Sequence, residues 1–239
     1  MPKSKLRNNN DIINFYELED VKKLNNKYEN PNYDLVGISH PSRVLIVSGS
    51  GGGKTNCLMN FIYRTGQGKG TYGHITLVSK MDEPLYTFLK DKLGENFTHF
   101  KNLADLPEPD KIENQDKQQL LIFDYMVAEK NQSKISEYIL RGRKIGRGIT
   151  IIYISQKYHK TPIFIRANIN YLILLKISGQ NDLSRILSDY TLAVDLKDFK
   201  DIYKDATKSK LDFMKIDIDE GDPNKKISKN WIDYYQIEE

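Results

Sequence analysis

The chain has 239 residues, of which 39% are hydrophobic and 28% charged, a composition typical of a folded protein rather than a largely disordered one. Its formal net charge of +4 is too small for the protein as a whole to attract nucleic acid, so any such binding needs local basic clusters. The single cysteine, Cys57, excludes an internal disulfide and a cysteine-based zinc site, as is usual in a reducing compartment.

The N-terminal segment differs in composition from the rest of the chain. Residues 1–10 are polar, and residues 11–33 mix aromatic side chains with Lys, Asn and Glu, which indicates a short helix with loops on the edge of the core. We expect a partly mobile extension over residues 1–35 and one folded domain over residues 36–239. We find neither the apolar core of a signal peptide nor an apolar run of membrane-spanning length, so we expect a soluble, intracellular protein without membrane contact.

Residues 43–55 have the sequence pattern of a phosphate-binding loop between a strand and a helix, R-V-L-I-V-S-G-S-G-G-G-K-T. The apolar run 44–47 predicts a strand buried on both faces of a parallel sheet. The glycines allow a tight loop whose backbone N–H groups turn toward an anion, and the N-terminus of the following helix also favours bound phosphate. The predicted nucleotide-binding residues are Gly49, Ser50, Gly51, Gly52, Gly53, Lys54 and Thr55.

Two side chains of this loop have expected roles. Lys54 would reach the β- and γ-phosphates, and the Thr55 hydroxyl would bind Mg²⁺. Because no N-K-x-D motif for guanine recognition occurs, ATP is the expected nucleotide. Ser48 stands where the usual G-x-x-x-x-G-K-[ST] pattern has its first glycine. The alternative is a glycine-rich turn that binds nothing, but the Lys-Thr pair between strand and helix favours a nucleotide site.

Strands and helices alternate along the rest of the chain, which predicts an α/β fold with a mostly parallel central sheet flanked by helices. Further strands are expected at 74–79, 97–100, 119–124, 149–156 and 171–177, and helices at 84–93, 133–144 and 182–190. Residues 102–117 are rich in Pro, Asp and Glu, which predicts a surface loop. The segments 211–217 and 225–231 flank D-I-D-E-G-D-P-N and predict a C-terminal β-hairpin.

Acidic residues near strand ends are candidates for the rest of the site. Asp124 ends a buried strand, where an NTP hydrolase places the acid that holds Mg²⁺; the alternative is an acid that only caps a turn. The next residue is Tyr125, although many such ATPases have there a second acid that polarises the attacking water. Glu129, in the following loop, is the expected base, and Asp82 and Glu83 are alternatives. A further alternative is a site that binds the nucleotide without hydrolysing it.

Two polar features flank the predicted strand 149–156. Gln156 ends this strand, where a side-chain amide can contact both the γ-phosphate and the attacking water; the alternative is a polar strand end with no role. Residues 141–148, which read R-G-R-K-I-G-R-G, are the densest basic cluster. Such a cluster is often only a solvated surface, but arginines beside glycines can also reach a γ-phosphate in a neighbouring subunit. Arg143 and Arg147 are the candidates.

These stretches together resemble the FtsK–HerA superfamily, and within it the genome-packaging ATPases of large double-stranded DNA viruses and virophages. The resemblance covers about residues 36–231 and is not confined to the phosphate loop. The matching stretches are V-S-G-S-G-G-G-K-T-N (47–56), L-L-I-F-D (120–124), R-G-R-K (141–144), I-I-Y-I-S-Q-K-Y (151–158), I-R-A-N-I-N-Y (165–171) and F-M-K-I-D (213–217). It implies that residues 36–239 form a P-loop NTPase domain of the ASCE, RecA-like type.

The resemblance also implies a function: an ATP-driven translocase that packages double-stranded viral DNA into a capsid. Its partners would be double-stranded DNA, further copies of the chain in a homo-oligomeric ring, and a viral capsid protein. Its location would be the host cytoplasm or viral factory, or alternatively the virion. By the resemblance, the site residues are Lys54, Thr55, Asp124, Gln156, Arg143 and Arg147, with Arg166 as a further candidate for the arginine that acts in trans.

Two other functions stay open at this point. A small-molecule or nucleoside kinase has the same phosphate loop, but it needs an acceptor pocket and a mobile lid with an arginine, which residues 155–170 do not suggest. A nucleotide-binding scaffold without catalysis is favoured by Tyr125. If the protein binds DNA, the candidate contacts follow Gln156, and the alternative there is an ordinary solvated loop. These candidates are Lys157, Tyr158, His159 and Lys160.

Overall fold

The computed structural model describes residues 14–24, 28–177 and 179–237. Its strands are β1 (Arg43–Val47), β2 (His74–Ser79), β3 (Phe97–Phe100), β4 (Gln119–Asp124), β5 (Ile149–Ser155), β6 (Tyr171–Leu174), β7 (Met214–Asp217), β8 (Ile227–Lys229) and β9 (Asp233–Tyr234). Its α-helices are α1 (Glu19–Leu24), α2 (Tyr33–Val36), α3 (Lys54–Thr65), α4 (Pro84–Leu93), α5 (Ser133–Arg141), α6 (Ile163–Arg166), α7 (Gln180–Asp189), α8 (Leu196–Ala206) and α9 (Pro223–Lys226). Short 3-10 turns occur between them.

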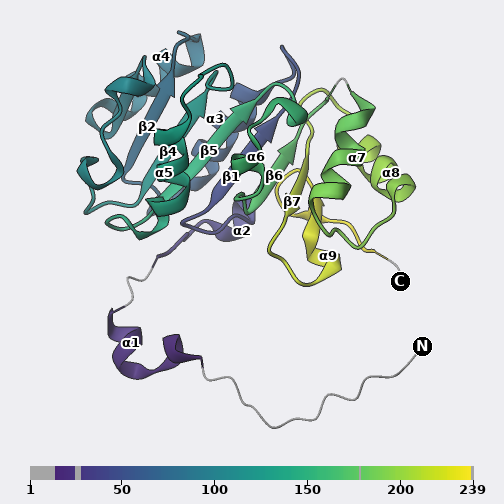
Figure 1. Cartoon of the computed structure of the whole chain (residues 1–239), viewed down its shortest axis with the longest axis horizontal. Coiled ribbons are helices and arrows are strands. Elements are labelled where there is room, and N and C mark those ends of the chain that lie inside the picture. The colour runs from purple at the N-terminus through teal and green to yellow at the C-terminus, as the bar shows by residue number, and fades with distance from the viewer. Residues whose placement is uncertain (1–13, 25–27, 178, 238–239) are drawn as a thin grey trace.

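Within the described residues, nine strands form one sheet in the order β3-β2-β4-β5-β1-β6-β7-β8-β9 (Figure 1). The first six in this order run parallel, and β7, β8 and β9 each run antiparallel to the strand before them. The predicted α/β fold with a mostly parallel sheet is therefore confirmed. In a parallel sheet all carboxyl ends meet at one edge, so the ends of β1, β4 and β5 lie close together.

Side chains of the central strands alternate between two apolar layers. Leu45 and Val47 belong to a cluster with residues of α5, α7 and α8, whereas Val44 and Ile46 belong to a cluster with residues of α3 and α4. All side chains of β2, β4 and β5 are buried. This burial on both faces explains why these strands read as continuous apolar runs rather than as alternating ones.

Several predicted elements differ in their bounds. The helix predicted over 133–144 ends at Arg141 and continues as a 3-10 turn, and the strand predicted over 171–177 ends at Leu174. The antiparallel pairing of β7 and β8 confirms the C-terminal hairpin, with shorter strands. Residues 102–117 are more than a surface loop, because they bury three apolar side chains in the core. These are Leu103, Leu106 and Ile112.

The segment 11–33, predicted to pack on the core edge, does so only in part. The side-chain amide of Asn32 donates hydrogen bonds to the carbonyl oxygens of Thr65 and Gln67, each at 3.0 Å. By contrast, Figure 1 shows α1 apart from the body of the protein. Residues 1–13 lie outside the described residues, so the predicted boundary at residue 35 stays a prediction.

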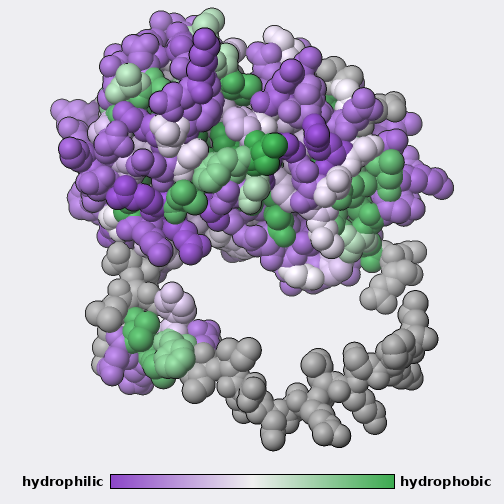
Figure 2. Space-filling view, viewed as in Figure 1, coloured by the Kyte–Doolittle hydropathy of each residue, from purple (hydrophilic) through white to green (hydrophobic). Residues whose placement is uncertain are grey.

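The face of the molecule seen in Figure 2 is mostly hydrophilic, with apolar side chains gathered in small patches. One patch lies in the middle of this view, over the region of α5 and α6 (Figures 1 and 2). Among the described residues, no helix has both the length and the apolar character needed to cross a lipid bilayer.

Candidate active site

The phosphate loop follows β1 and lies between the ends of β5 and β6, which both pair with β1. Gly51 and Gly53 have φ angles of 67° and 92°, a left-handed conformation that side chains disfavour. A Cβ on Gly52 would lie 1.9 Å from the Ser48 Oγ atom, so this position needs glycine as well. Gly53 is the N-cap of α3, so the free N–H groups of the first helical turn face the loop.

Ser48 has a structural role that accounts for its departure from the usual pattern. Its side chain is buried, and its hydroxyl donates a hydrogen bond of 3.0 Å to the carbonyl oxygen of Lys176. The N–H of Gly49 donates to the same carbonyl at 3.4 Å. These bonds join the phosphate loop to the segment that follows β6, and a glycine at position 48 would lose the side-chain bond.

Lys54 is held over the phosphate loop. Its ammonium group donates hydrogen bonds of 2.9 Å to the carbonyl oxygens of Ser48 and Gly49. Burial lowers the pKa of Lys54, while the charges of Asp124 and Glu83 raise it. The ammonium therefore lies in a partly buried place beside the loop where phosphates would bind, and both of these hydrogen bonds go to neutral carbonyls.

Asp124 is buried at the end of β4 and is held by two tyrosines. Its carboxylate accepts a 2.5 Å hydrogen bond from the Tyr86 hydroxyl and a 3.0 Å bond from the backbone N–H of Tyr125. Burial raises the pKa of Asp124, and the bond from Tyr86 lowers it. The Thr55 side chain also lies near the phenol of Tyr86, so both predicted Mg²⁺ ligands are close to this residue.

This arrangement fits a Mg²⁺ site of the P-loop type. Thr55 and Asp124 offer oxygen atoms, which Mg²⁺ prefers, from two elements that meet beside Lys54. Among the residues that the structure describes, no group of three or more His, Cys, Asp or Glu side chains is placed to hold a metal ion. A magnesium ion here would therefore complete its coordination with phosphate and water oxygens, as it usually does in such sites.

Three acids are candidates for the catalytic base, and two of them form ion pairs with exposed lysines. Glu129, the expected base, forms an ion pair with Lys80. Asp82 is exposed and forms an ion pair with Lys101.

Glu83 is connected to the site through Tyr125, which lines the nucleotide pocket with Lys54 and Asp124. It is the N-cap of α4, and its carboxylate accepts a 3.2 Å hydrogen bond from the Tyr125 hydroxyl. Its charge raises the pKa of both Lys54 and Asp124. Tyr125 has a φ angle of 59°, so the backbone conformation after β4 is one that few residues other than glycine adopt. Tyr125 thus joins Asp124 to Glu83.

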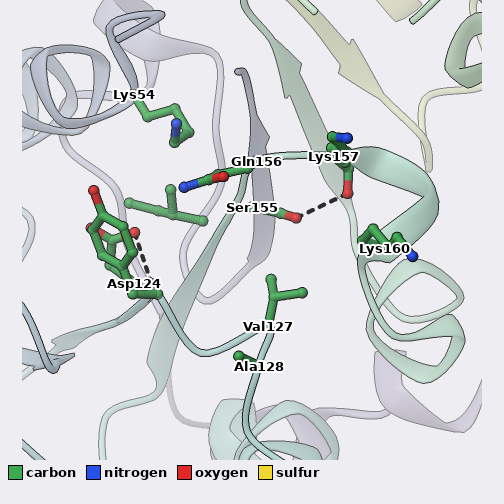
Figure 3. A pocket seen from close by; sticks show the side chains of 10 residues that line it. Lys54, Asp124, Val127, Ala128, Ser155, Gln156, Lys157 and Lys160 are labelled. Atoms are coloured by element: carbon green, nitrogen blue, oxygen red, sulfur yellow. Dashed lines mark hydrogen bonds between the residues drawn. The ribbon is translucent and has the colours of Figure 1, made fainter. Parts of the chain in front are cut away.

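A pocket of about 390 Å³ opens between the phosphate loop and the ends of β4 and β5. Gln156 follows β5 directly, and its side chain points toward the space between Lys54 and Asp124 (Figure 3). Because β5 lies between β1 and β4, the strand order is the one that the proposed sensing role requires. A Gln156 amide at this place can contact a γ-phosphate and a water beside it.

The loop after Gln156 is divided between the pocket and the core. Lys157 and Lys160 line the same pocket, on the side away from Lys54 (Figure 3). Tyr158 is buried and cannot serve as the DNA contact considered from the sequence. The His159 ring is bonded to the Asp182 carboxylate at 2.9 Å, which ties it to α7.

Arg143 and Arg147 are exposed at the opposite edge of the sheet from the phosphate loop. They precede β5, whereas the loop follows β1, and the two strands are parallel. A ring nitrogen of buried His40 is bonded at 3.0 Å to the Arg147 carbonyl oxygen, which fixes this turn. Neither arginine can therefore reach the nucleotide of its own subunit.

Arg166 is in a different situation, because its side chain is buried. It forms an ion pair with Asp189, donates from Nε to the Thr161 carbonyl at 3.2 Å, and lies 4.9 Å from the centre of the Tyr158 ring. These contacts indicate a side chain that holds α6 against α7, not one free to reach another subunit.

The comparison with protein families decides the assignment. A model described as "Poxvirus A32 protein" matches residues 34–219, which is most of the chain. The chain belongs to this family. None of the curated proteins matches it. The family match confirms the resemblance to viral genome-packaging ATPases that the sequence predicts.

Solved structures show the same fold as this A32-family chain. The genome-packaging NTPase B204 of Sulfolobus turreted icosahedral virus 2, with sulfate, is 16% identical at a TM-score of 0.58, over 76% of this chain and 94% of B204. The DNA-packaging ATPase B204 of Sulfolobus turreted icosahedral virus is 15% identical at a TM-score of 0.52, and the match covers 80% of this chain and 94% of that protein. The pCW3 conjugation coupling protein TcpA, with ATPγS, is 12% identical at a TM-score of 0.52, and the match covers 82% of this chain and 61% of TcpA. At these identities the likeness is one of fold.

Sequence reasoning missed one functional residue of this A32-family site. Tyr86, which binds Asp124 and contacts Thr55, is read from the sequence only as part of the helix 84–93. The one available signal is its position three residues after Glu83, in the first turn of a helix that follows a buried strand. That signal is weak, because an aromatic residue in such a turn is usually a core residue.

Proposed function

We propose that this chain is an ATP-driven motor that packages double-stranded DNA into a viral capsid. The proposal is carried by one observation: the phosphate loop, Asp124 and Gln156 meet at the same edge of the sheet in a chain of the Poxvirus A32 family. The common fold with B204, which is described as a genome-packaging NTPase that binds ATPγS, supports it. The nucleotide-binding residues are Gly49, Ser50, Gly51, Gly52, Gly53, Lys54 and Thr55.

Each group of the site has a chemical role in phosphoryl transfer to water. The loop N–H groups and Lys54 neutralise the β- and γ-phosphates, where negative charge develops in the transition state. Thr55 and Asp124 would hold a Mg²⁺ ion, which would supply further charge neutralisation at the phosphates. Gln156 orients the attacking water and responds to the loss of the γ-phosphate.

The catalytic base is Glu129 or Glu83, and the two assignments predict that different glutamine variants lose turnover. Replacing the base by glutamine should keep ATP binding and lower turnover roughly a hundredfold or more, as the loss of a general base does. Glu129→Gln tests the sequence-based prediction, and Glu83→Gln tests the acid that acts on Lys54 and Asp124. Asp82→Asn is the matched control, because Asp82 is exposed and paired with Lys101. Steady-state turnover and nucleotide binding are measured together. Normal turnover in all three variants would show that none of these acids is the base, whereas a wild type that binds ATP without hydrolysing it would favour a non-catalytic scaffold.

The active unit is a homo-oligomeric ring in which Arg143 or Arg147 of one subunit completes the site of the next. Their place at the edge opposite the phosphate loop supports this arrangement, since a head-to-tail contact brings opposite edges together. The ring acts on double-stranded DNA and docks on a viral capsid protein. It works in the host cytoplasm or viral factory, or on the virion.

DNA-dependent turnover tests the proposed function. We expect the assembled protein to hydrolyse ATP faster in the presence of duplex DNA, and equally for unrelated duplexes of equal length, because a packaging motor must move along any sequence. The same preparation should transfer no phosphate to a panel of nucleoside and small-molecule acceptors. No response to duplex DNA, or phosphate transfer to an acceptor, would contradict the proposal and favour the scaffold or the kinase.

A further inference from the structure

A second cavity, outside the nucleotide pocket, carries a row of lysines. Lys200 and Lys204 lie four residues apart on one face of α8, about 6 Å along its axis, and Lys208 follows in the turn after the helix. With Lys176 they line a groove of about 470 Å³. We call this the α8 groove. Figure 1 shows α7 and α8 side by side beyond β6 and β7, at the end of the sheet away from β3.

The α8 groove has an excess of positive charge. Its lining contains four lysines and one acid, Asp201. Among the described residues, none of these four ammonium groups has an acid within ion-pair distance, whereas other lysines of the chain are paired. Like charges that line one groove repel one another, so an anion that neutralises them gains free energy.

The groove is joined to the phosphate loop by hydrogen bonds. The Tyr203 hydroxyl of α8 accepts from the N–H of Ile177 at 2.8 Å and donates to the carbonyl of Leu175 at 3.0 Å. Between these two residues lies Lys176, whose carbonyl accepts from the Ser48 hydroxyl and the Gly49 N–H. The segment 175–177 therefore contacts α8 on one side and the phosphate loop on the other.

We propose that the α8 groove binds the phosphate backbone of double-stranded DNA and that Tyr203 couples this binding to the phosphate loop. The inference rests on the proposed packaging function. Lys200 and Lys204 are about 6 Å apart along α8 and Lys208 lies beyond them on the same groove, a spacing that suits successive phosphates of one strand. Lysines are flexible point charges that contact phosphates without reading bases, as a motor that moves along any sequence requires. Lys157 and Lys160 line the nucleotide pocket itself, and so they are less suited to this contact.

Salt-dependent binding tests the contact. Duplex affinity is measured at several salt concentrations for the wild type and for the triple variant Lys200→Ala, Lys204→Ala, Lys208→Ala. The log–log slope should become less steep by about 2.7, since each lost phosphate contact contributes about 0.9. The control is a triple alanine variant of the exposed residues Lys90, Lys92 and Lys111, near the other end of the sheet, which should keep the wild-type slope. Arginine at positions 200, 204 and 208 keeps the charges and should restore the slope.

The outcomes separate this inference from the proposed function. If the wild type binds duplex DNA and the groove triple variant keeps the wild-type slope, the groove is excluded while packaging stands. If the wild type neither binds duplex DNA nor responds to it in turnover, the packaging function fails and this inference with it. Thermal melting of each variant shows whether its fold is intact. If the alanine variant is unfolded, glutamine at positions 200, 204 and 208, which removes the charges but keeps long polar side chains, should give the same loss of slope, and an unchanged slope in that variant would exclude the groove.

The coupling has its own readout. Tyr203→Phe keeps the aromatic ring but removes the hydroxyl that bonds Leu175 and Ile177. It should leave duplex affinity within about twofold of the wild type and reduce the ratio of turnover with DNA to turnover without it toward one. Tyr235→Phe, which removes an exposed hydroxyl bonded to Asp205 on the same helix, is the matched control. An unchanged ratio in Tyr203→Phe would exclude the coupling.

Discussion

Replacing Lys54 by alanine should abolish ATP hydrolysis and leave the fold intact. Among the residues that the structure describes, the Lys54 ammonium is the positive charge that bonds to the carbonyls of the phosphate loop itself. Without it, the charge that develops on the phosphates in the transition state loses its direct partner. The fold does not depend on it, since its two hydrogen bonds go to carbonyls at the rim of a pocket.

Steady-state turnover and thermal melting of the same preparation measure this effect. The control is Lys69→Ala, because Lys69 is exposed in the turn after α3 and has no role in the site. Lys157 and Lys160 line the far side of the pocket, so the double variant Lys157→Ala, Lys160→Ala on the Lys54→Ala background shows whether they supply any residual rate. Wild-type turnover in a folded Lys54→Ala protein would contradict the assignment of the phosphate loop.

The parts of the site that are local in sequence could be predicted from the sequence. The phosphate loop is one such part, because a buried strand, a run of glycines and a Lys-Thr pair follow one another directly. Asp124 is another, since it ends a short continuous apolar run of the kind that forms a buried strand. Gln156 follows from the same rule, together with the strand order that parallel β1, β4 and β5 adopt.

The contacts between distant segments could not be predicted. The bond from Tyr86 to Asp124 spans 38 positions, and the bond from Ser48 to Lys176 spans 128. Neither depends on a local pattern; both arise only when the sheet brings strand ends together. Helix α8 was missed for a different reason. Its many Lys and Asp residues mask an apolar stripe formed by Phe199, Ile202, Tyr203 and Ala206, which packs on the core.

The structure also changes the ranking of the three arginines that are candidates for the trans-acting residue. The sequence alone ranks Arg143, Arg147 and Arg166 by position in basic or family-like stretches. Because Arg166 is buried and forms an ion pair with Asp189, its role is structural. Exposure at the edge opposite the phosphate loop leaves Arg143 and Arg147 as the side chains that a neighbouring subunit's nucleotide could meet.

Arg143→Ala or Arg147→Ala should bind ATP normally but hydrolyse it about a thousandfold more slowly, or worse, as the loss of a trans-acting arginine does. Arg141→Ala is the matched control, since Arg141 lies in the same basic cluster but is near Asp110 and Glu137 of its own subunit. It should keep most of the activity. Nucleotide binding, turnover and oligomeric state are measured for each variant, because a variant that fails to assemble would also lose activity.

Mixing two inactive variants distinguishes action in trans from action within one subunit. A Lys54→Ala subunit has intact arginines, and an Arg143→Ala or Arg147→Ala subunit has an intact phosphate loop. Where they meet in the right order, one interface contains both intact halves, so the mixture should recover part of the wild-type turnover. Arginines acting within their own subunit give no recovery at any ratio. Full activity of both single arginine variants as assembled proteins would exclude the proposal, and Arg166, which is buried, would not replace them without a rearrangement of α6 and α7.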